Sequence, residues 1–347
     1  MRDVVMVTVG LIAALPALAA DAPEPMALKG HKATVVGLAF TADGRTMASW
    51  EERGGLKLWA MPKGTERPLE VKIDGQPLAL SADGKSLVLA DNTAVLLCDL
   101  ANGKTAKLGT HHSRAGFAAF TPDGKSLITA TYAGVQGEIK MWDVAAKKES
   151  GTQLTLPTEL VGATFGHAAV QALAVSPDGK TLATGHHIAN ANPSDWHSGK
   201  VRLWDQATGK ERRVCETRDF QAASLTFLPD SKTLVAAGEA RNGDSILLID
   251  VETGKVKSTF AGSGARSRSL VVTPDGNYLA SVSEGSVIRI WHVPSGKVRA
   301  TVIAHSFKKP VAAVAFSPDV RLLVATCDED KDNAVRMWDV ARLLEKK

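Results

Sequence analysis

Cysteine is scarce in this chain. Among 347 residues there are three, Cys98, Cys215 and Cys327, which lie far apart and form no Cys-x-x-Cys pair. An odd number of widely spaced cysteines does not support a disulfide framework, a thiolate zinc site or an attached haem. The sequence therefore gives no indication of a cysteine-based site.

The chain also lacks a large excess of either positive or negative charge. The 41 basic residues nearly balance the 37 acidic ones, the net charge is +4, and no block of like charge interrupts the chain. Proteins that bind nucleic acid concentrate their basic residues on one face. This balance therefore predicts no nucleic-acid partner.

Long apolar runs are missing except at the N-terminus. There, Arg2 precedes a mainly apolar run from Val4 to Leu15, which is followed by Pro16 and an Ala-Leu-Ala triplet ending at Ala19. This order is typical of a secretory signal peptide, and it predicts cleavage after Ala19. The alternative is an uncleaved anchor, because the run up to Ala20 is at the lower limit for crossing a bilayer. We expect a signal peptide at 1–19, a linker at 20–24, and an exported, periplasmic or secreted protein with no membrane span after cleavage.

What the chain does have is a repeat. With 44% hydrophobic residues, 30 glycines and 15 prolines, it is suited to a core of short strands joined by turns. An apolar stretch, a Pro-Asp-Gly-like turn, a second apolar stretch and a third that ends in Trp-Asp recur along it. The turn aspartates are Asp43, Asp83, Asp123, Asp178, Asp230, Asp275 and Asp319. The matching positions at the end of the third stretch are Trp59, Cys98, Trp142, Trp204, Ile249, Trp291 and Trp338.

One unit shows why the repeat predicts strands. A short apolar stretch at 170–176 runs into the turn Pro177-Asp178-Gly179, where proline presets φ, aspartate bonds the backbone ahead of it and glycine tolerates positive φ. The stretch at 201–205 then alternates apolar and polar residues, as a half-buried strand does. Such a unit cannot bury both of its faces alone, so the copies must stack on one another.

These motifs carry a family resemblance. Gly30-His31 near the start, Phe316-Ser317-Pro318-Asp319 and the final stretch from Val335 to Asp339 resemble the WD-repeat family, over about residues 25 to 347. The resemblance implies an all-β, seven-bladed β-propeller of four-stranded antiparallel blades. It also implies that Pro25 to Lys29 forms the outer strand of the last blade, beside Val335 to Val340, which closes the ring and removes an exposed sheet edge.

The same resemblance implies structural tetrads of His, Ser or Thr, Asp and Trp. The last blade has a full set, His305, Thr326, Asp332 and Trp338. The first blade has His31, Ser49 and Trp59 with Arg53 at the Asp position, and the fourth has His167, Thr184 and Trp204 with Ser198 there. Blades two and five lack the Trp. We interpret these sets as structural hydrogen bonds rather than catalytic triads.

The candidate binding site lies on the loops, which carry function in such scaffolds. Blade four has an enlarged loop between its second and third strands, over 185–199, and a second insertion near 156–166 that the family's strand order places on the same face. The predicted partner-binding residues are Trp196, His186, His187, Asp195, His197, Arg114 and Arg218. Trp196 either anchors a partner or pins its own loop.

Metal sites are the weaker interpretation of these residues. His186, His187, His197 and Asp195 are suitable ligands, but adjacent residues on a strand point to opposite faces, so we predict no metal. The acidic loop at 328–333 has calcium-like spacing with an incomplete ligand set. Basic residues that precede several first strands suggest a mild preference for acidic partners: Arg114, Arg218, Arg266, Arg268, Lys308 and Lys309.

Three functions remain open. The resemblance most often implies a non-enzymatic interaction scaffold with a protein partner, and we expect one that is monomeric and has no cofactor. The alternative is an exported propeller enzyme, of the lactonase or quinone-dependent dehydrogenase type, which needs a ring of metal ligands that the sequence does not supply. A carbohydrate-binding module ranks lowest, because Tyr132 and Tyr278 are the only tyrosines.

Overall fold

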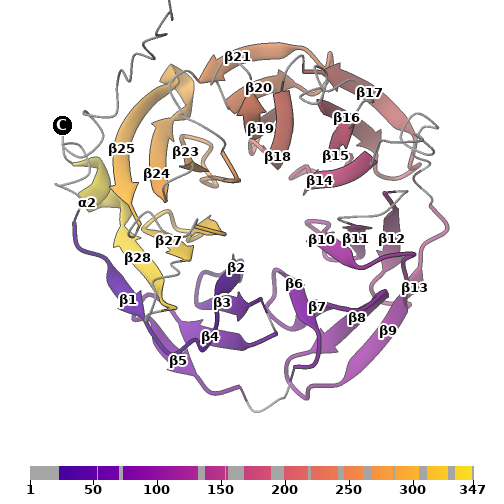
Figure 1. Ribbon diagram of the computed structural model, residues 1–347, viewed down its shortest axis with the longest axis horizontal. Coiled ribbons are helices and arrows are strands. Elements are labelled where there is room, and N and C mark those ends of the chain that lie inside the picture. The colour runs from indigo at the N-terminus through magenta and orange to yellow at the C-terminus, as the bar shows by residue number, and fades with distance from the viewer. Residues whose placement is uncertain are drawn as a thin grey trace, which may run out of the picture.

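Seven four-stranded antiparallel sheets form a closed ring around a central opening (Figure 1). This arrangement is seen in a computed structural model that describes residues 23–52, 54–69, 73–131, 137–152, 154, 168–188, 199–217, 220–240, 246–260, 267–283, 286–304, 311–326 and 333–345. The predicted seven-bladed all-β fold is therefore confirmed. The predicted signal peptide and most of the linker lie outside the described residues.

Each blade is a meander, and its successive strands are arranged from the centre of the ring to the outside. Blade one contains β2 (Val35–Phe40), β3 (Thr46–Glu51), β4 (Leu56–Ala60) and β5 (Thr65–Arg67). Blade two contains β6 (Gln76–Leu80), β7 (Ser86–Asp91), β8 (Ala94–Asp99) and β9 (Thr105–Thr110). Blade three contains β10 (Ala115–Phe120), β11 (Ser126–Thr131), β12 (Ile139–Asp143) and β13 (Lys148–Glu149).

The remaining blades repeat the pattern. Blade four contains β14 (Ala168–Val175), β15 (Thr181–Ile188), β16 (Gly199–Asp205) and β17 (Glu211–Glu216). Blade five contains β18 (Phe220–Phe227), β19 (Thr233–Ala240), β20 (Ile246–Asp250) and β21 (Val256–Phe260). Blade six contains β22 (Ser269–Val272), β23 (Tyr278–Ser283), β24 (Val287–His292) and β25 (Lys297–Ile303), with the short 3-10 helix η3 (Val293–Ser295) before its outer strand.

The seventh blade is made from both ends of the chain. It contains β26 (Val314–Phe316), β27 (Leu322–Thr326), β28 (Val335–Asp339) and, as its outer strand, β1 (Met26–Leu28). Strand β1 pairs with β28 in the register Met26 to Met337 and Leu28 to Val335. The predicted closure of the ring by the N-terminal strand is confirmed, and β28 has a partner on each side.

The turn between the first and second strands is held by its aspartate. In blade one, the Thr41 hydroxyl donates to Asp43 Oδ1 at 2.6 Å, and the same oxygen accepts from Arg45 N–H at 3.0 Å. Gly44 completes the turn with φ of 66°, a conformation that a side chain disfavours. Equivalent bonds join Ser81 to Asp83, Thr121 to Asp123, Ser176 to Asp178, Thr273 to Asp275 and Ser317 to Asp319. This is why the motif recurs in six blades, whereas in blade five Leu228 replaces the hydroxyl residue and Asp230 accepts from the backbone N–H groups of Lys232 and Thr233.

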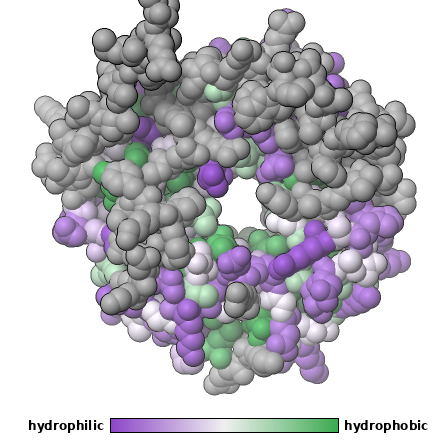
Figure 2. Space-filling model, viewed as in Figure 1, coloured by the Kyte–Doolittle hydropathy of each residue, from purple (hydrophilic) through white to green (hydrophobic). Residues whose placement is uncertain are grey.

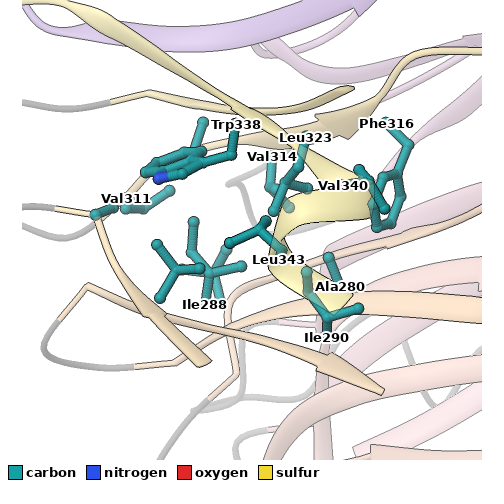
Figure 3. Packing of buried hydrophobic residues seen from close by; sticks show 14 residues of the cluster. Ala280, Ile288, Ile290, Val311, Val314, Phe316, Leu323, Trp338, Val340 and Leu343 are labelled. Atoms are coloured by element: carbon teal, nitrogen blue, oxygen red, sulfur yellow. The ribbon is translucent and has the colours of Figure 1, made fainter. Parts of the chain in front are cut away.

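Apolar clusters between neighbouring blades form the core. One of them lies between blades six and seven, where Ile288 and Ile290 of β24 face Trp338 and the helix α2 (Val340–Leu344) (Figure 3). Val340 and Leu343 of that helix are both buried there. Because each cluster needs side chains from two sheets, no blade buries its faces alone.

The inner strands carry a repeated irregularity. In five of the seven blades, the pairing of the first strand with the second shifts by one residue near the start of the first strand, as a β-bulge does. The shifts lie between Val35 and Gly37, Pro77 and Ala79, Ala115 and Phe117, Val170 and Ala172, and Ala222 and Ser224. The extra residue in each strand therefore lies next to the central opening.

Candidate functional site

Hydrogen bonds from tryptophan to a buried hydroxyl link the second and third strands of four blades. Each indole N–H donates to a Ser or Thr side chain one strand further in, at 2.7 to 2.8 Å. The pairs are Trp59 with Ser49, Trp142 with Thr129, Trp204 with Thr184 and Trp291 with Ser281. The predicted pairs of blades one and four are thus present.

In blade one, the hydrogen bonds continue from Ser49 through a histidine to a carboxylate. His31 Nε2 lies 2.6 Å from Ser49 Oγ, and His31 Nδ1 lies 2.9 Å from Glu51 Oε1. Because Ser49 accepts from Trp59, its hydroxyl donates to Nε2, and the Nδ1 proton of a neutral ring donates to Glu51. Lys32 N–H donates to the same carboxylate at 2.8 Å. The set ties the loop before β2 to the end of β3.

The charges of this pair follow from burial. Desolvation lowers the pKa of His31 by more than the hydrogen bond and charge of Glu51 raise it. Burial pushes the pKa of Glu51 up, but the hydrogen bonds from Lys32 and His31 together hold it below its ordinary value. The pair is therefore a neutral imidazole donating to a carboxylate.

Blade three contains a second complete set. His111 Nε2 lies 2.7 Å from Thr129 Oγ1, and His111 Nδ1 lies 2.9 Å from Glu138 Oε2. Lys140 Nζ lies 3.1 Å from the other oxygen of Glu138. Burial again lowers the pKa of His111 below its ordinary value, against the opposing effect of Glu138.

Sequence reasoning missed both carboxylates. It looked for an aspartate at a fixed distance before the tryptophan and found Arg53, which lies outside the described residues. The structure supplies a glutamate from the end of β3 in blade one and one just before β12 in blade three. The longer glutamate side chain reaches the histidine from either edge of the loop. A Glu within a few residues of these strand ends, rather than an Asp at one position, is the signal that finds them.

In blade four, a histidine on a strand contacts the buried hydroxyl. His186, on β15 itself, lies 2.7 Å from Thr184 Oγ1, whereas His167 and Ser198 lie outside the described residues. The His186 side chain is 1% exposed, and burial, with the nearby charge of Arg202, lowers its pKa to about 3. Its Nδ1 has no hydrogen-bond partner among the described residues. In this position the ring faces the interior of the blade, not the solvent.

The other predicted site residues are partly visible. His187 pairs through its backbone with Ala169 and Gly199, and Arg114 is exposed just before β10. The remaining predicted partner-binding residues lie outside the described residues: Trp196, Asp195, His197 and Arg218. Of the predicted partner-binding residues in the blade-four loop, the structure therefore describes His186 and His187.

Two of the four residues of the predicted tetrad in the last blade are described. Thr326 and Trp338 are both buried, on β27 and β28. Thr326 Oγ1 accepts from the backbone N–H of Ala312 at 2.9 Å and of Ala313 at 3.1 Å. His305 and Asp332 lie outside the described residues, so the full set stays a prediction.

The described residues contain neither a cluster of metal ligands nor a helix that could span a membrane. Within them, no three or more His, Cys, Asp or Glu side chains lie close enough together to hold a metal ion. The helices in this part of the chain are all too short or too polar to cross a membrane.

Comparison with known families places the repeats. The family model described as WD domain, G-beta repeat matches residues 159–205, 254–292 and 296–339. Each match ends where the third strand of a blade ends, at Asp205, His292 and Asp339. The last two matches also begin just before an outer strand, β21 or β25, so each of these sequence repeats runs from the outer strand of one blade through the inner three strands of the next.

Similar curated proteins are distant and longer. The chain is 23% identical over 321 residues to apoptotic protease-activating factor 1 of Rattus norvegicus, which covers 86% of this chain and 22% of that protein. It is 27% identical over 149 residues to target of rapamycin complex subunit wat1 of Schizosaccharomyces pombe, covering 42% and 44% respectively. It is 23% identical over 269 residues to actin-interacting protein 1 of Drosophila melanogaster, covering 77% and 40%. The chain thus spans less than half the length of each of these relatives.

Proposed function

Because this chain belongs to the WD-repeat family of β-propellers, we propose that it is a non-enzymatic scaffold outside the cytoplasm, binding a protein partner through the loop face enlarged at blade four. One observation carries the proposal. Two sets of groups of the kind found in catalytic triads are bound to one another as structural links: His31 with Ser49 and Glu51, and His111 with Thr129 and Glu138.

These links hold the loop face in place. His31 and His111 precede the first strands of their blades, and Glu51 and Glu138 lie at the connection between the second and third strands. Each set therefore joins the two kinds of loop that share one face of the ring. A scaffold needs such a fixed surface, because rigid loops lose less conformational entropy when a partner binds.

Two relatives support a protein partner by name. Wat1 is named as a subunit of a complex, and actin-interacting protein 1 is named for an interaction with a protein. The export part of the proposal rests on the N-terminal pattern alone. Expressed in a bacterium with an intact secretion system, the chain should appear in the periplasm and begin at Ala20. A cytoplasmic chain that keeps residues 1–19 would contradict it, as N-terminal sequencing would show.

The partner surface is tested at Trp196. In the anchor interpretation, Trp196→Ala should weaken the binding of a captured partner at least tenfold, because buried aromatic anchors dominate interface energies. Affinity is measured by surface plasmon resonance, with thermal melting as the check on folding. Trp196→Phe, which keeps an aromatic ring, should lose less. Full affinity in Trp196→Ala would move the partner away from the blade-four loop.

A further inference from the structure

A depression of about 580 Å³ lies beside the central opening, where the first strands of blades one to three begin. Its volume falls within the range of ~300–1,000 Å³ that is typical of ligand pockets. Figure 2 shows the opening, with hydrophobic residues gathered next to it over β2 and β6. The lining consists of Val36, Trp50, Gln76, Pro77, Leu78, Ser113, Arg114, Ala115 and Gly116.

The apolar floor is a product of the strand irregularities. Val36, Leu78 and Gly116 are the three extra residues of the shifted registers in β2, β6 and β10, and all three line the depression. A bulge re-aims the side chain that it carries. The bulges of β2 and β6 thus turn the side chains of Val36 and Leu78 toward one place, and the bulge of β10 contributes the backbone of Gly116.

Trp50 completes this floor from β3. Its indole lies directly over Gly37, where a Cβ would overlap the ring, so only glycine lets the indole lie this close to the inner strand. The residue is mostly buried, at 6% exposed, and what remains accessible lines the depression. The floor therefore combines a rigid aromatic edge with the aliphatic side chains of the bulges.

The charge of the depression is one-sided. Arg114 is its one charged lining residue, and the lining contains no acidic side chain. Arg114 is exposed and makes a single long hydrogen bond, 3.5 Å, from Nη2 to the neutral amide oxygen of Gln76. It forms no ion pair within the described part of the chain, whereas Lys57 and Lys140 each contact a glutamate. A guanidinium beside an apolar floor is complementary to a carboxylate beside an apolar side chain.

We propose that this depression binds an extended segment of a protein partner that carries an Asp or Glu next to an apolar residue. The carboxylate pairs with Arg114 in the two-point geometry that a guanidinium favours. The apolar neighbour covers Trp50 and Leu78. The depression is open rather than enclosed, which suits a passing chain better than a small molecule, whose site encloses most of its surface. The proposal rests on the scaffold function and names the chemistry of its partner.

A second pocket supplies the matched control. It has a volume of about 500 Å³ and lies at the opposite ends of the strands, between blades one and two. Arg67 and Lys85 line it together with Asp43 and Asp83, so its two positive charges are balanced by two negative ones. Arg67→Gln therefore removes the same charge from a pocket that has no unmet preference for an acid.

The test uses labelled octapeptides with one varied central pair. The pair is leucine followed by Asp, Glu, Asn or Gln in a Gly-Ser background, and binding to the purified chain is followed by fluorescence polarisation. We expect the acidic peptides to bind at least tenfold more tightly than the amide peptides. Arg114→Gln should abolish this difference, while Arg67→Gln leaves it unchanged. Leu78→Ser should weaken all four peptides several-fold and keep the acid preference.

Several results would overturn the proposal. They are equal binding of acid and amide peptides, a preference that survives Arg114→Gln, no measurable binding of any peptide, or N-acetylaspartate binding as tightly as the octapeptides. The last result would make the depression a small-carboxylate site. Partner capture that is lost in Trp196→Ala but unchanged in Arg114→Gln would refute the depression and leave the scaffold function standing. Capture unchanged in both variants would refute the loop-face function itself.

Discussion

Each complete set of Trp, hydroxyl, His and Glu depends on the Ser or Thr residue whose hydroxyl lies at its centre. Thr129 accepts from the Trp142 indole and contacts His111 Nε2, and all three groups are buried. Without that oxygen, an indole N–H and an imidazole nitrogen lose their partners in a dry environment. The cost of an unpaired buried polar group exceeds the net gain from one hydrogen bond.

Thr129→Val, which keeps the shape and removes the hydroxyl, should therefore destabilise the fold. We expect a loss of roughly 1–3 kcal/mol for each group left unpaired, measured as the free energy of unfolding in urea. Thr129→Ser, which keeps the oxygen, should lose distinctly less. Equal stability of the valine and wild-type chains would mean that the set contributes nothing to the fold.

The buried histidines make the fold sensitive to acid. Burial lowers the pKa of His31, His111 and His186 in the folded chain, that of His186 to about 3. In the unfolded chain they take up protons below about pH 6.5. The unfolded state then binds more protons, so stability falls as the pH falls below 6.5. The lowered pKa values of Glu51 and Glu138 also make stability fall as the pH decreases, once the pH is below the ordinary pKa of a glutamate.

Unfolding free energy measured from pH 7 to pH 4 should decline accordingly, by up to about 1.4 kcal/mol per pH unit for each histidine that stays neutral when folded. His186→Gln should flatten the decline, since that side chain no longer titrates. A decline of the same steepness in His186→Gln would show that this ring does not resist protonation.

At the scale of the element, β1 has an effect out of proportion to its three residues. It covers the outer edge of β28, and its Leu28 packs in a buried cluster with Val35, Met47 and Trp59 of blade one. The strand therefore joins the last blade to the first as well as completing the last.

Deletion of 25–29 should lower the melting temperature sharply, because it removes both the edge pairing and this contact between blades. Differential scanning calorimetry of the deleted and intact chains measures the effect. Removal of 344–347, at the other end of the same blade, is the comparison: it takes away the last residue of α2 but spares Val340 and Leu343, so the melting temperature should change less. An unchanged melting temperature after the first deletion would contradict the closure of the ring by β1.

The elements were more predictable than the contacts between them. The turn motif around Asp43 and its copies depends on local bonds, so the strands on either side could be placed from the sequence. The outer strand of the last blade was predictable because the repeat is offset from the blade. The carboxylates Glu51 and Glu138 were not, since what matters is where a flexible side chain reaches across a loop. The bulges in β2, β6 and β10 leave no composition signal, and the depression that they line was missed with them.

At the scale of the whole molecule, the seven units are not equivalent. Blades two and five carry Cys98 and Ile249 where others have tryptophan, and both side chains are buried. These blades therefore have no indole linked to a hydroxyl at this position and fill it with an apolar side chain. Among the predicted contact residues that the structure describes, Arg114 lines a cavity. The blade-four loop lies largely outside the described residues, and its role stays a prediction.

The pairing of β1 with β28 brings residues 26–28 and 335–337 side by side, so the described chain starts and stops on one sheet. A covalent bridge of a few residues between these segments would leave every sheet intact. New ends could then be opened in the loop between blades one and two. A circularly permuted chain of this kind should assemble the same circle, with its seam moved to a different pair of sheets.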